Sequence, residues 1–417
     1  MNSLIKNSIA LILMQGVNYI IPLITLPYLT RALGVSQYGA LNTALNIILY
    51  MILFVDFGFN LSATREIAKN KLNYKYINNI YWNVIASKIS ISIFIISIFL
   101  LAVFQIEKYN DIKYTILFMI PQIIGSIMFP LWLYQGIEKI YLVSIISTFS
   151  KLLTIPLFII FVNTPEDLNT AAIIQSLPLL ISGITSTIIL IKWKAITPPI
   201  LKNIKIKSTI YDSLPIFLGS AAISLYTLCT PIILSLMSNF TEVGYYVAAD
   251  KLRSAILGIF LILGQVIYPR VNILLQNNIN EYYKFIRKLI IIQLMLSTIA
   301  MITFYFIMPL LAPFILGGEF YNLGIIIKIM SPMIILIPSS VILANCILLP
   351  MGKNKLYAII PSITAVIHLP YTLVLSKYYG ALGSSISILL TEIISFLLLF
   401  LACYKLSYLK RVISHNE

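Results

Sequence analysis

The segment Leu382–Leu401, LGSSISILLTEIISFLLLFL, decides the fold class of this chain. It contains one charged side chain, Glu392, and lacks the sustained alternation of apolar and polar residues that is typical of a barrel strand. At a helical rise of 1.5 Å per residue, a segment of this length crosses about 30 Å of hydrocarbon. The segment therefore predicts a transmembrane helix.

Apolar runs of this kind recur along the whole chain. Of its 417 residues, 59 % are hydrophobic and only 10 % are charged, which is more apolar surface than a soluble core of this length could enclose. A lipid-exposed backbone must satisfy its own hydrogen bonds, and a helix does so. The sequence predicts an all-α integral membrane protein with about twelve transmembrane helices. The runs are Leu11–Thr30, Leu41–Ser62, Ile80–Phe104, Ile116–Tyr134, Leu142–Val162, Ala171–Ile191, Leu214–Met237, Ala249–Leu275, Leu289–Met308, Gly324–Leu349, Leu356–Leu375 and Leu382–Leu401.

The net charge of +15 is explained by membrane topology and does not require nucleic acid as a partner. Cytoplasmic loops of membrane proteins are rich in Lys and Arg. If both termini lie in the cytoplasm, most of the 29 basic residues fall in cytoplasmic loops. The external loops then hold only Arg31, Lys108, Lys113 and Lys377. We therefore expect a multi-pass membrane protein with both termini cytoplasmic.

A polar stretch near the midpoint divides the chain. Lys192–Asp212 contains Pro198 and Pro199 and has the composition of a linker. The two halves on either side of this stretch resemble each other in sequence, and Pro27 in the first half matches Pro231 in the second. The sequence predicts an N-terminal six-helix bundle over residues 1–194, a cytoplasmic linker over 195–211 and a C-terminal six-helix bundle over 212–417. We expect these two pseudo-symmetric six-helix bundles to surround a central cavity.

Ionisable residues inside the apolar runs are the candidates for function. A charge near the centre of a bilayer costs at least about 2.5 kcal/mol, so we expect such residues either to pair with an opposite charge or to serve the function of the protein. One interpretation is structural pairing. Asp250 would pair with Arg253, and Lys151 or Lys328 would pair with Glu392 or Asp56 on another helix. The other is a wet cavity with a cationic lining, which would select an anionic headgroup. The residues are Asp56, Lys88, Lys151, Asp250, Lys251, Arg253, Lys328, His368 and Glu392.

Residue patterns for catalysis are missing from the sequence. There are two histidines, His368 and His415, and no phosphate-binding glycine-rich loop or soluble domain. Cys229, Cys346 and Cys403 lie in separate apolar runs without His or acidic neighbours at ligand spacing. We expect no enzymatic activity, no ATP hydrolysis, no cofactor and no metal site.

Two segments carry a family resemblance. TLPYLTRALGVSQYGALN over Thr25–Asn42 and DFGFNLSATREIA over Asp56–Ala68 resemble the bacterial polysaccharide-transport family of lipid-linked oligosaccharide flippases, and O-antigen flippases above all. That family belongs to the multidrug/oligosaccharidyl-lipid/polysaccharide exporter superfamily. The pattern Arg-x-Leu-Gly-x-x-x-Tyr-Gly at Arg31–Gly39 is its most specific part, and the resemblance in length and hydropathy extends over the whole chain.

The resemblance implies a flippase of the bacterial inner membrane. Such a protein moves undecaprenyl-diphosphate-linked repeat units from the cytoplasmic to the periplasmic leaflet by alternating access. Its partners would be the lipid-linked oligosaccharide, membrane lipids and, in an export complex, a polysaccharide polymerase and a chain-length regulator. The alternatives are a multidrug cation antiporter of the same superfamily and a membrane-embedded polysaccharide polymerase.

Roles for the candidate residues follow from this hypothesis. The basic residues within or beside the apolar runs would contact the diphosphate or acidic sugars of the substrate. The acidic residues would be their resting charge partners, or would bind the proton or sodium ion that drives transport. The basic set is Arg31, Lys88, Lys151, Lys251 and Arg253, and the acidic set is Asp56, Asp250 and Glu392.

Overall fold

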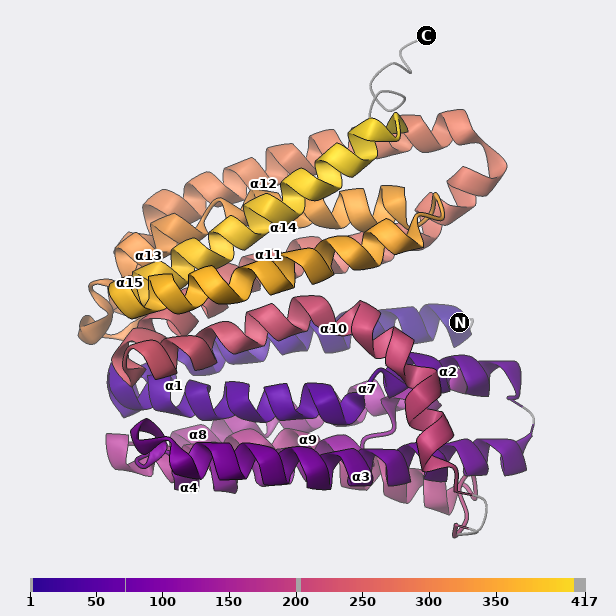
Figure 1. Ribbon diagram of the computed structural model, residues 1–417, viewed down its shortest axis with the longest axis horizontal. Helices are drawn as coiled ribbons and strands as arrows, with labels where there is room; N and C mark the ends of the chain where they lie inside the picture. Colours follow the sequence, from indigo (N-terminus) through magenta and orange to yellow (C-terminus); the bar gives the residue numbers. More distant parts are fainter. Residues whose placement is uncertain (1–2, 72, 200–203, 409–417) are drawn as a thin grey trace. The chain divides into compact units, whose positions relative to one another are not determined.

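Long α-helices make up almost all of the computed structural model, which describes residues 3–71, 73–199 and 204–408 (Figure 1). Within these residues there is no β-strand, as the sequence predicts. Nine of the described helical segments are long and apolar enough to cross a membrane. A tenth, α10 (Ile206–Met237), also qualifies but bends by 75° between Leu218 and Ala221.

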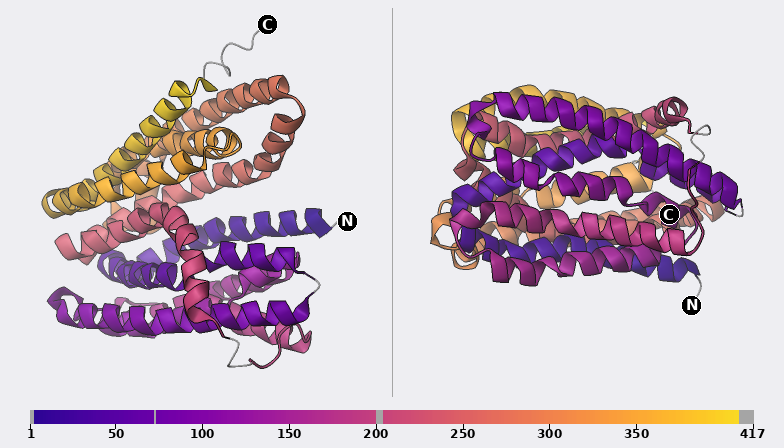
Figure 2. Two further views of the ribbon diagram at one scale, coloured as in Figure 1. Left: turned by 45° about the vertical axis from the view of Figure 1, so that its right-hand side comes forward. Right: turned by 90° about the horizontal axis from the view of Figure 1, so that it is seen from below.

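Two of these helical segments are long enough for two spans each, which agrees with the predicted twelve spans. α1 (Ser3–Asp56) has 54 residues and α15 (Asn354–Lys405) has 52, so each would extend about 80 Å if straight. Each turns at a glycine in a non-helical conformation, Gly34 (φ 69°) in α1 and Gly380 (φ 54°) in α15. Figures 1 and 2 show the two arms of each segment running back alongside each other.

The hairpin of α15 is closed by a carboxylate. Glu242 lies in the first turn of α11 (Phe240–Asn277), and its Oε2 accepts a hydrogen bond of 2.6 Å from the Ala381 backbone N–H. That N–H lies at the start of the second arm, where backbone donors generally lack helical partners, so an acidic side chain there satisfies it. A Cβ at Gly380 would lie 2.5 Å from the same oxygen, so the site requires glycine both for conformation and for space.

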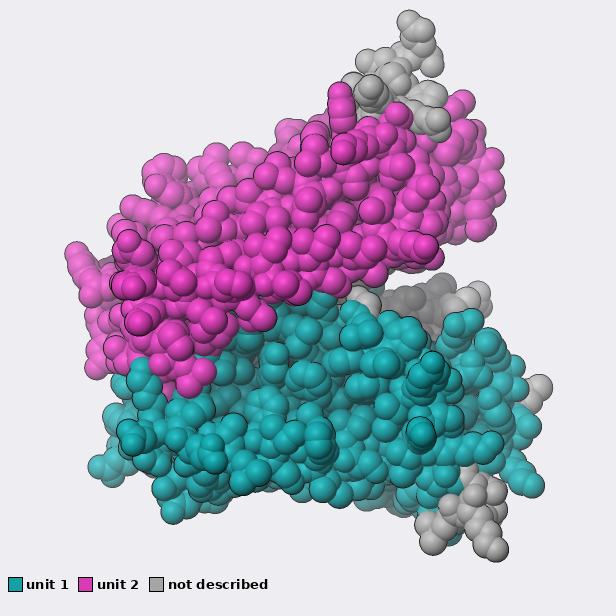
Figure 3. All heavy atoms as spheres, in the orientation of Figure 1, with its two compact units in different colours: residues 1–232 teal, residues 233–417 magenta. Residues whose placement is uncertain are grey.

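The chain forms two compact units, Met1–Ile232 and Ile233–Glu417 (Figure 3). The division falls within α10, because its first turns pack on the first unit. Ser213 and Ser62 hydroxyls lie 2.8 Å apart, and the Phe217 ring stacks on Phe57 at 4.7 Å. The bundle boundaries 1–194 and 212–417 stay a prediction. The described residues do not include residues 200–203 of the linker or the two ends of the chain. Four ionisable residues of the sequence therefore lie outside them: Lys202, Lys410, Arg411 and His415.

The first unit is held by close backbone packing. A Cβ added to Gly125 would lie 2.4 Å from Leu180 N, and one added to Gly183 would lie 2.5 Å from Gly125 O. Small residues let membrane helices approach in this way. The Thr187 hydroxyl donates to the Met128 carbonyl across the same contact, and the Tyr134 hydroxyl donates to the Ser186 carbonyl from the helix that follows Met128. After α1 the helices of this unit are α2 (Phe59–Lys69), α3 (Tyr74–Gln105), α4 (Lys113–Phe118), α5 (Ile120–Met128), α6 (Leu131–Gly136), α7 (Ile140–Leu152), α8 (Thr154–Phe161) and α9 (Leu168–Lys192).

The second unit contains α11, α15 and a segmented span between them. Asn278 caps the start of α12 (Ile279–Leu316) by accepting hydrogen bonds from Asn280 N and Glu281 N, and Gly317 (φ 109°) ends the helix. The expected single span Gly324–Leu349 is a chain of shorter helices that ends in a π-helix over Ile342–Leu348. The remaining helices of the unit are α13 (Leu323–Met330) and α14 (Met333–Val341).

Candidate functional site

Lys88 and Asp56 form a charged cluster inside the first unit. Lys88, in the middle of α3, is only 1 % exposed, and its Nζ lies 2.7 Å from Asp56 Oδ1 at the end of α1. The same ammonium donates to the Ser126 carbonyl at 3.1 Å, while the Ser126 hydroxyl donates to Asp56 at 3.3 Å. The structure thus brings two of the predicted residues together. Asp56 keeps 31 % of its side chain exposed, so one side of the pair is open.

The position of Asp56 depends on a helix break that the sequence pattern did not reveal. The predicted span Leu41–Ser62 ends early, because Phe57 (φ 38°) and Gly58 (φ 74°) adopt left-handed conformations and α2 starts anew at Phe59. A Cβ at Gly58 would lie 2.9 Å from Phe217 N, so a larger residue would press against α10. The break places the Asp56 carboxylate at a helix end instead of within a continuous span.

Lys151 has a neutral partner. Its Nζ on α7 donates to Asn18 Oδ1 on the first arm of α1, and the contact is half-buried. Neither Glu392 nor Asp56, the partners considered from the sequence, makes this contact. Asn18 was missed because an uncharged amide in an apolar run does not stand out. Arg31 lies on an exposed position of the same arm, shortly before the turn at Gly34.

The second unit holds the pair Asp250 and Arg253, as the three-residue spacing predicts. Arg253 is 7 % exposed, its Nη2 lies 2.5 Å from Asp250 Oδ1, and its Nη1 lies 2.7 Å from Met333 Sδ. Its Nε is buried and has no hydrogen-bond partner among the described residues. Lys251, between them in sequence, is half-buried on α11.

A polar network lines the hairpin of α15 beside Glu392. His368 is fully buried, with Nδ1 2.6 Å from Thr391 Oγ1 and Nε2 3.0 Å from Thr372 Oγ1. The Tyr371 hydroxyl meets the same Thr391 oxygen, and Glu392, 7 % exposed, follows directly. Within the apolar runs, His368 and Glu392 stand out because they are titratable, whereas the hydroxyl groups beside them do not. A row of hydroxyl groups could be predicted here from the sequence, because Ser384, Ser387, Thr391 and Ser395 follow one another at intervals of three or four residues. That spacing places them along one face of a helix.

Each unit therefore carries charged and hydroxyl groups at buried or half-buried positions. The predicted substrate-binding and charge-partner residues separate between the two units. The first unit holds Arg31, Lys88, Lys151 and Asp56, and the second holds Lys251, Arg253, Asp250 and Glu392. Among the described residues, no group of three or more His, Cys, Asp or Glu is placed to hold a metal ion. These charged and hydroxyl groups can form ion pairs and hydrogen bonds with a polar solute.

Comparison with known proteins places the chain in a family. The family model described as "Polysaccharide biosynthesis protein" matches residues 4–275. The chain is 33 % identical over 412 residues to a protein of Escherichia coli (strain K12) named "Putative O-antigen transporter", covering 97 % of this chain and 98 % of that one. A protein of the same name from Shigella dysenteriae is 32 % identical, over 93 % of this chain and 97 % of its own.

Solved transporters share the fold. Lipid II flippase MurJ in an inward closed conformation has a TM-score of 0.73 at 15 % identity, covering 99 % of this chain and 90 % of that one. An inward-facing multidrug resistance MATE family transporter of the MOP superfamily has a TM-score of 0.68 at 14 % identity, covering 97 % of this chain and 100 % of its own. At these identities the likeness concerns the fold alone.

Proposed function

Because the chain belongs to the family of polysaccharide biosynthesis proteins, we propose that it is the flippase for a lipid-linked polysaccharide repeat unit. It is a membrane transporter and not an enzyme, since its full-length relatives are named transporters. The observation that carries the proposal is the relationship to an O-antigen transporter over 97 % of the chain. The substrate is an undecaprenyl-diphosphate-linked O-antigen unit or a related surface polysaccharide unit, moved from the cytoplasmic to the periplasmic leaflet of the inner membrane.

The physical task explains the polar interior. Sugar hydroxyls and a diphosphate lose their water partners in hydrocarbon, at a cost of about 1 kcal/mol or more for each hydroxyl. A path lined with hydroxyls, amides and cations replaces those partners, while the polyprenyl tail stays in lipid. The buried hydroxyls of α15 and the ammonium of Lys151, which donates to the neutral amide of Asn18, have the right chemistry. The two six-helix bundles alternate access between the two leaflets.

Within this proposal the basic residues contact the anionic part of the substrate. These basic residues are Arg31, Lys88, Lys151, Lys251 and Arg253. Three carboxylates pair with them when no substrate is bound, or bind the coupling ion: Asp56, Asp250 and Glu392. A diphosphate that displaces Asp56 from Lys88 meets an ammonium already aligned by the Ser126 carbonyl. The polymerase and chain-length regulator of an export complex are the proposed protein partners.

The decisive experiment locates the lipid-linked units in a deletion strain. Without the protein, we expect surface polysaccharide to be lost and the lipid-linked units to remain in the cytoplasmic leaflet. Wild-type protein should restore both, whereas Lys151→Gln should restore polysaccharide at least about tenfold more weakly, because it removes a half-buried charge without stranding a carboxylate. Lys192→Gln, at an exposed position on α9, is the matched control and should behave as wild type.

Units that reach the periplasmic leaflet without this protein would contradict the proposal. Equal transport by Lys151→Gln and wild type would remove Lys151 from the substrate path while leaving the flippase assignment in place.

A multidrug cation antiporter is the second candidate, favoured by the fold shared with the MATE transporter. An antiporter for cations is expected to carry carboxylates in its cavity, whereas the ionisable residues within the spans of this chain are mainly basic. In the deletion strain the antiporter alternative predicts greater susceptibility to cationic drugs with normal surface polysaccharide. The polymerase alternative is set aside because the full-length relatives are named transporters.

A further inference from the structure

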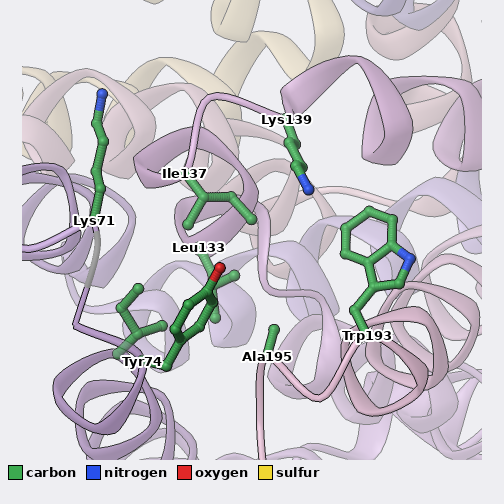
Figure 4. A pocket seen from close by; sticks show the side chains of 8 residues that line it. Lys71, Tyr74, Leu133, Ile137, Lys139, Trp193 and Ala195 are labelled. Atoms are coloured by element: carbon green, nitrogen blue, oxygen red, sulfur yellow. The ribbon is translucent and has the colours of Figure 1, made fainter.

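A pocket in the first unit lies apart from the buried charges described above. It has a volume of about 360 Å³ and is lined at the ends of α6 and α9 and at the start of α3 (Figure 4). Lys71 and Lys139 stand on opposite sides of it, with Tyr74 and Ile137 between them and the Trp193 ring beside Lys139. The side chains of two lysines, a tyrosine and a tryptophan thus line a space within the size range of small-molecule sites, with the Lys71 ammonium directed away from the others (Figure 4).

The walls of the pocket are built by ordered helix ends. α6 closes with a 2.8 Å bond from Lys139 N to Tyr134 O, and α9 with a 3.0 Å bond from Ala195 N to Leu190 O. These closures hold Glu138 (φ 58°) and Lys194 (φ 54°) in the left-handed region, where glycine is the usual residue. Two of the four described non-glycine residues with positive φ therefore flank this pocket.

The segment after α9 is also attached to α3. The Trp82 indole donates to Thr197 O at 2.7 Å, and Thr197 N donates to Asn78 Oδ1 at 2.9 Å. These bonds fix the wall that carries Trp193 and Ala195. A wall held by these bonds would need little reordering on binding.

The charged side chains around the pocket favour an anionic ligand. Lys139 Nζ lies 4.5 Å from the centre of the Trp193 ring, an arrangement in which the ammonium keeps donors for a second partner. Lys71 pairs with Glu138, but the two side chains are 38 % and 50 % exposed. Exposed pairs of this kind contribute little and can exchange partners. With two lysines and one glutamate, the pocket keeps a positive balance.

We propose that this pocket binds the phosphate headgroup of a membrane lipid. Basic pockets with Trp and Tyr at the ends of membrane helices have the composition of headgroup sites. Lys71 and Lys139 bind the phosphate oxygens, Tyr74 donates a hydrogen bond, and Ile137 and Trp193 contact the adjoining alkyl groups. The lipid is an anionic phospholipid, or the polyprenyl diphosphate of the transported lipid; only the second source rests on the proposed function.

Lipid titration of the purified full-length chain tests the site. The protein is held in nanodiscs of phosphatidylcholine, and binding of added phosphatidylglycerol is followed by native mass spectrometry. Lys71→Gln with Lys139→Gln should weaken binding about tenfold. The matched control, Lys75→Gln with Lys192→Gln, removes the same charge from exposed positions that do not line the pocket and should bind as wild type.

Glu138→Gln provides the opposite change. It releases Lys71 from its carboxylate and should strengthen binding several-fold, a result that a merely structural lysine would not produce. It also keeps the test usable if the double lysine variant fails to fold. Equal binding by wild type, the double lysine variant and Glu138→Gln would overturn the proposal, as would equal losses in the double variant and its control.

The same variants identify the lipid. Preference for phosphatidylglycerol over undecaprenyl diphosphate makes the pocket a phospholipid site, and the reverse preference makes it a loading site for the transported lipid. Inorganic phosphate at the same concentration should bind weakly, and binding as tight as that of either lipid would overturn the lipid assignment. Because phosphatidylglycerol binding needs no transport, loss of the flippase assignment would leave this result unchanged.

Discussion

At the residue scale, Lys88 illustrates how a charge can be kept inside a membrane protein. Its side chain is 1 % exposed, yet it has a carboxylate at 2.7 Å and a carbonyl at 3.1 Å. The sequence marks Lys88 and Asp56 as unusual because both interrupt apolar runs. Their pairing could not be read from it, because they lie on different helices, 32 positions apart, and only the packing of α3 against α1 joins them.

The pair predicts a compensating double substitution. Lys88→Met leaves Asp56 without its counter-charge and should lower the stability of the detergent-purified protein by about 3 kcal/mol. Lys88→Met with Asp56→Asn should recover most of that loss, because neither charge remains. Lys75→Met, at an exposed position on α3, is the control for the loss of a lysine. Thermal unfolding measured by fluorescence distinguishes the four proteins.

The double variant also separates structure from transport. If Lys88 only balances Asp56, the stable double variant should restore surface polysaccharide in the deletion strain. A stable but inactive double variant would assign Lys88 or Asp56 to the substrate or to the coupling ion.

At the element scale, glycines decide how helices approach and where they turn. Gly34 and Gly380 turn α1 and α15 into hairpins, which is why apolar segments of 54 and 52 residues each form two spans. Gly125 and Gly183 let α5 and α9 pack backbone against backbone. Hydropathy predicts that helices exist in these regions, but it does not predict the break between α5 and α6 or the π-helix after α14.

The contact between α5 and α9 predicts a large effect from one methyl group. In Gly183→Ala the new Cβ would lie 2.5 Å from Gly125 O, a backbone atom that cannot rotate away. We expect a loss of about 2 to 3 kcal/mol in stability and a lower melting temperature in detergent. Gly318→Ala is the control, because nothing lies within 4 Å of its Cβ position, and it should change stability by less than about 0.5 kcal/mol. Equal melting temperatures for both variants would contradict the packing argument.

At the scale of the whole molecule, orientation in the membrane follows from the distribution of charge. The sequence predicts that most of the 29 basic residues lie in loops on the cytoplasmic side, with Arg31, Lys108, Lys113 and Lys377 on the other. The three cysteines, Cys229, Cys346 and Cys403, are buried and free, so a cysteine introduced on the surface would be labelled against a low background.

Labelling with a membrane-impermeant maleimide tests this orientation. In intact cells with a permeabilised outer membrane, Lys108→Cys should react and Lys75→Cys should not, while in inverted vesicles the reactivities should be exchanged. Both positions are exposed in the structure, so failure to react reports the side of the membrane instead of burial. The opposite pattern would invert the proposed topology.

The sequence by itself determined that this chain is an all-helical membrane protein, and the motif at Arg31–Gly39 indicated its family. Those conclusions depend on hydropathy, length and local pattern, which are properties of single segments. The tertiary structure alone decided that Lys88 meets Asp56, that Lys151 meets Asn18, that hydroxyls surround His368 and that Lys71, Lys139 and Trp193 share a pocket. Contacts between distant segments depend on helix breaks and on which faces pack together, and apolar runs that are alike in composition do not encode that choice locally.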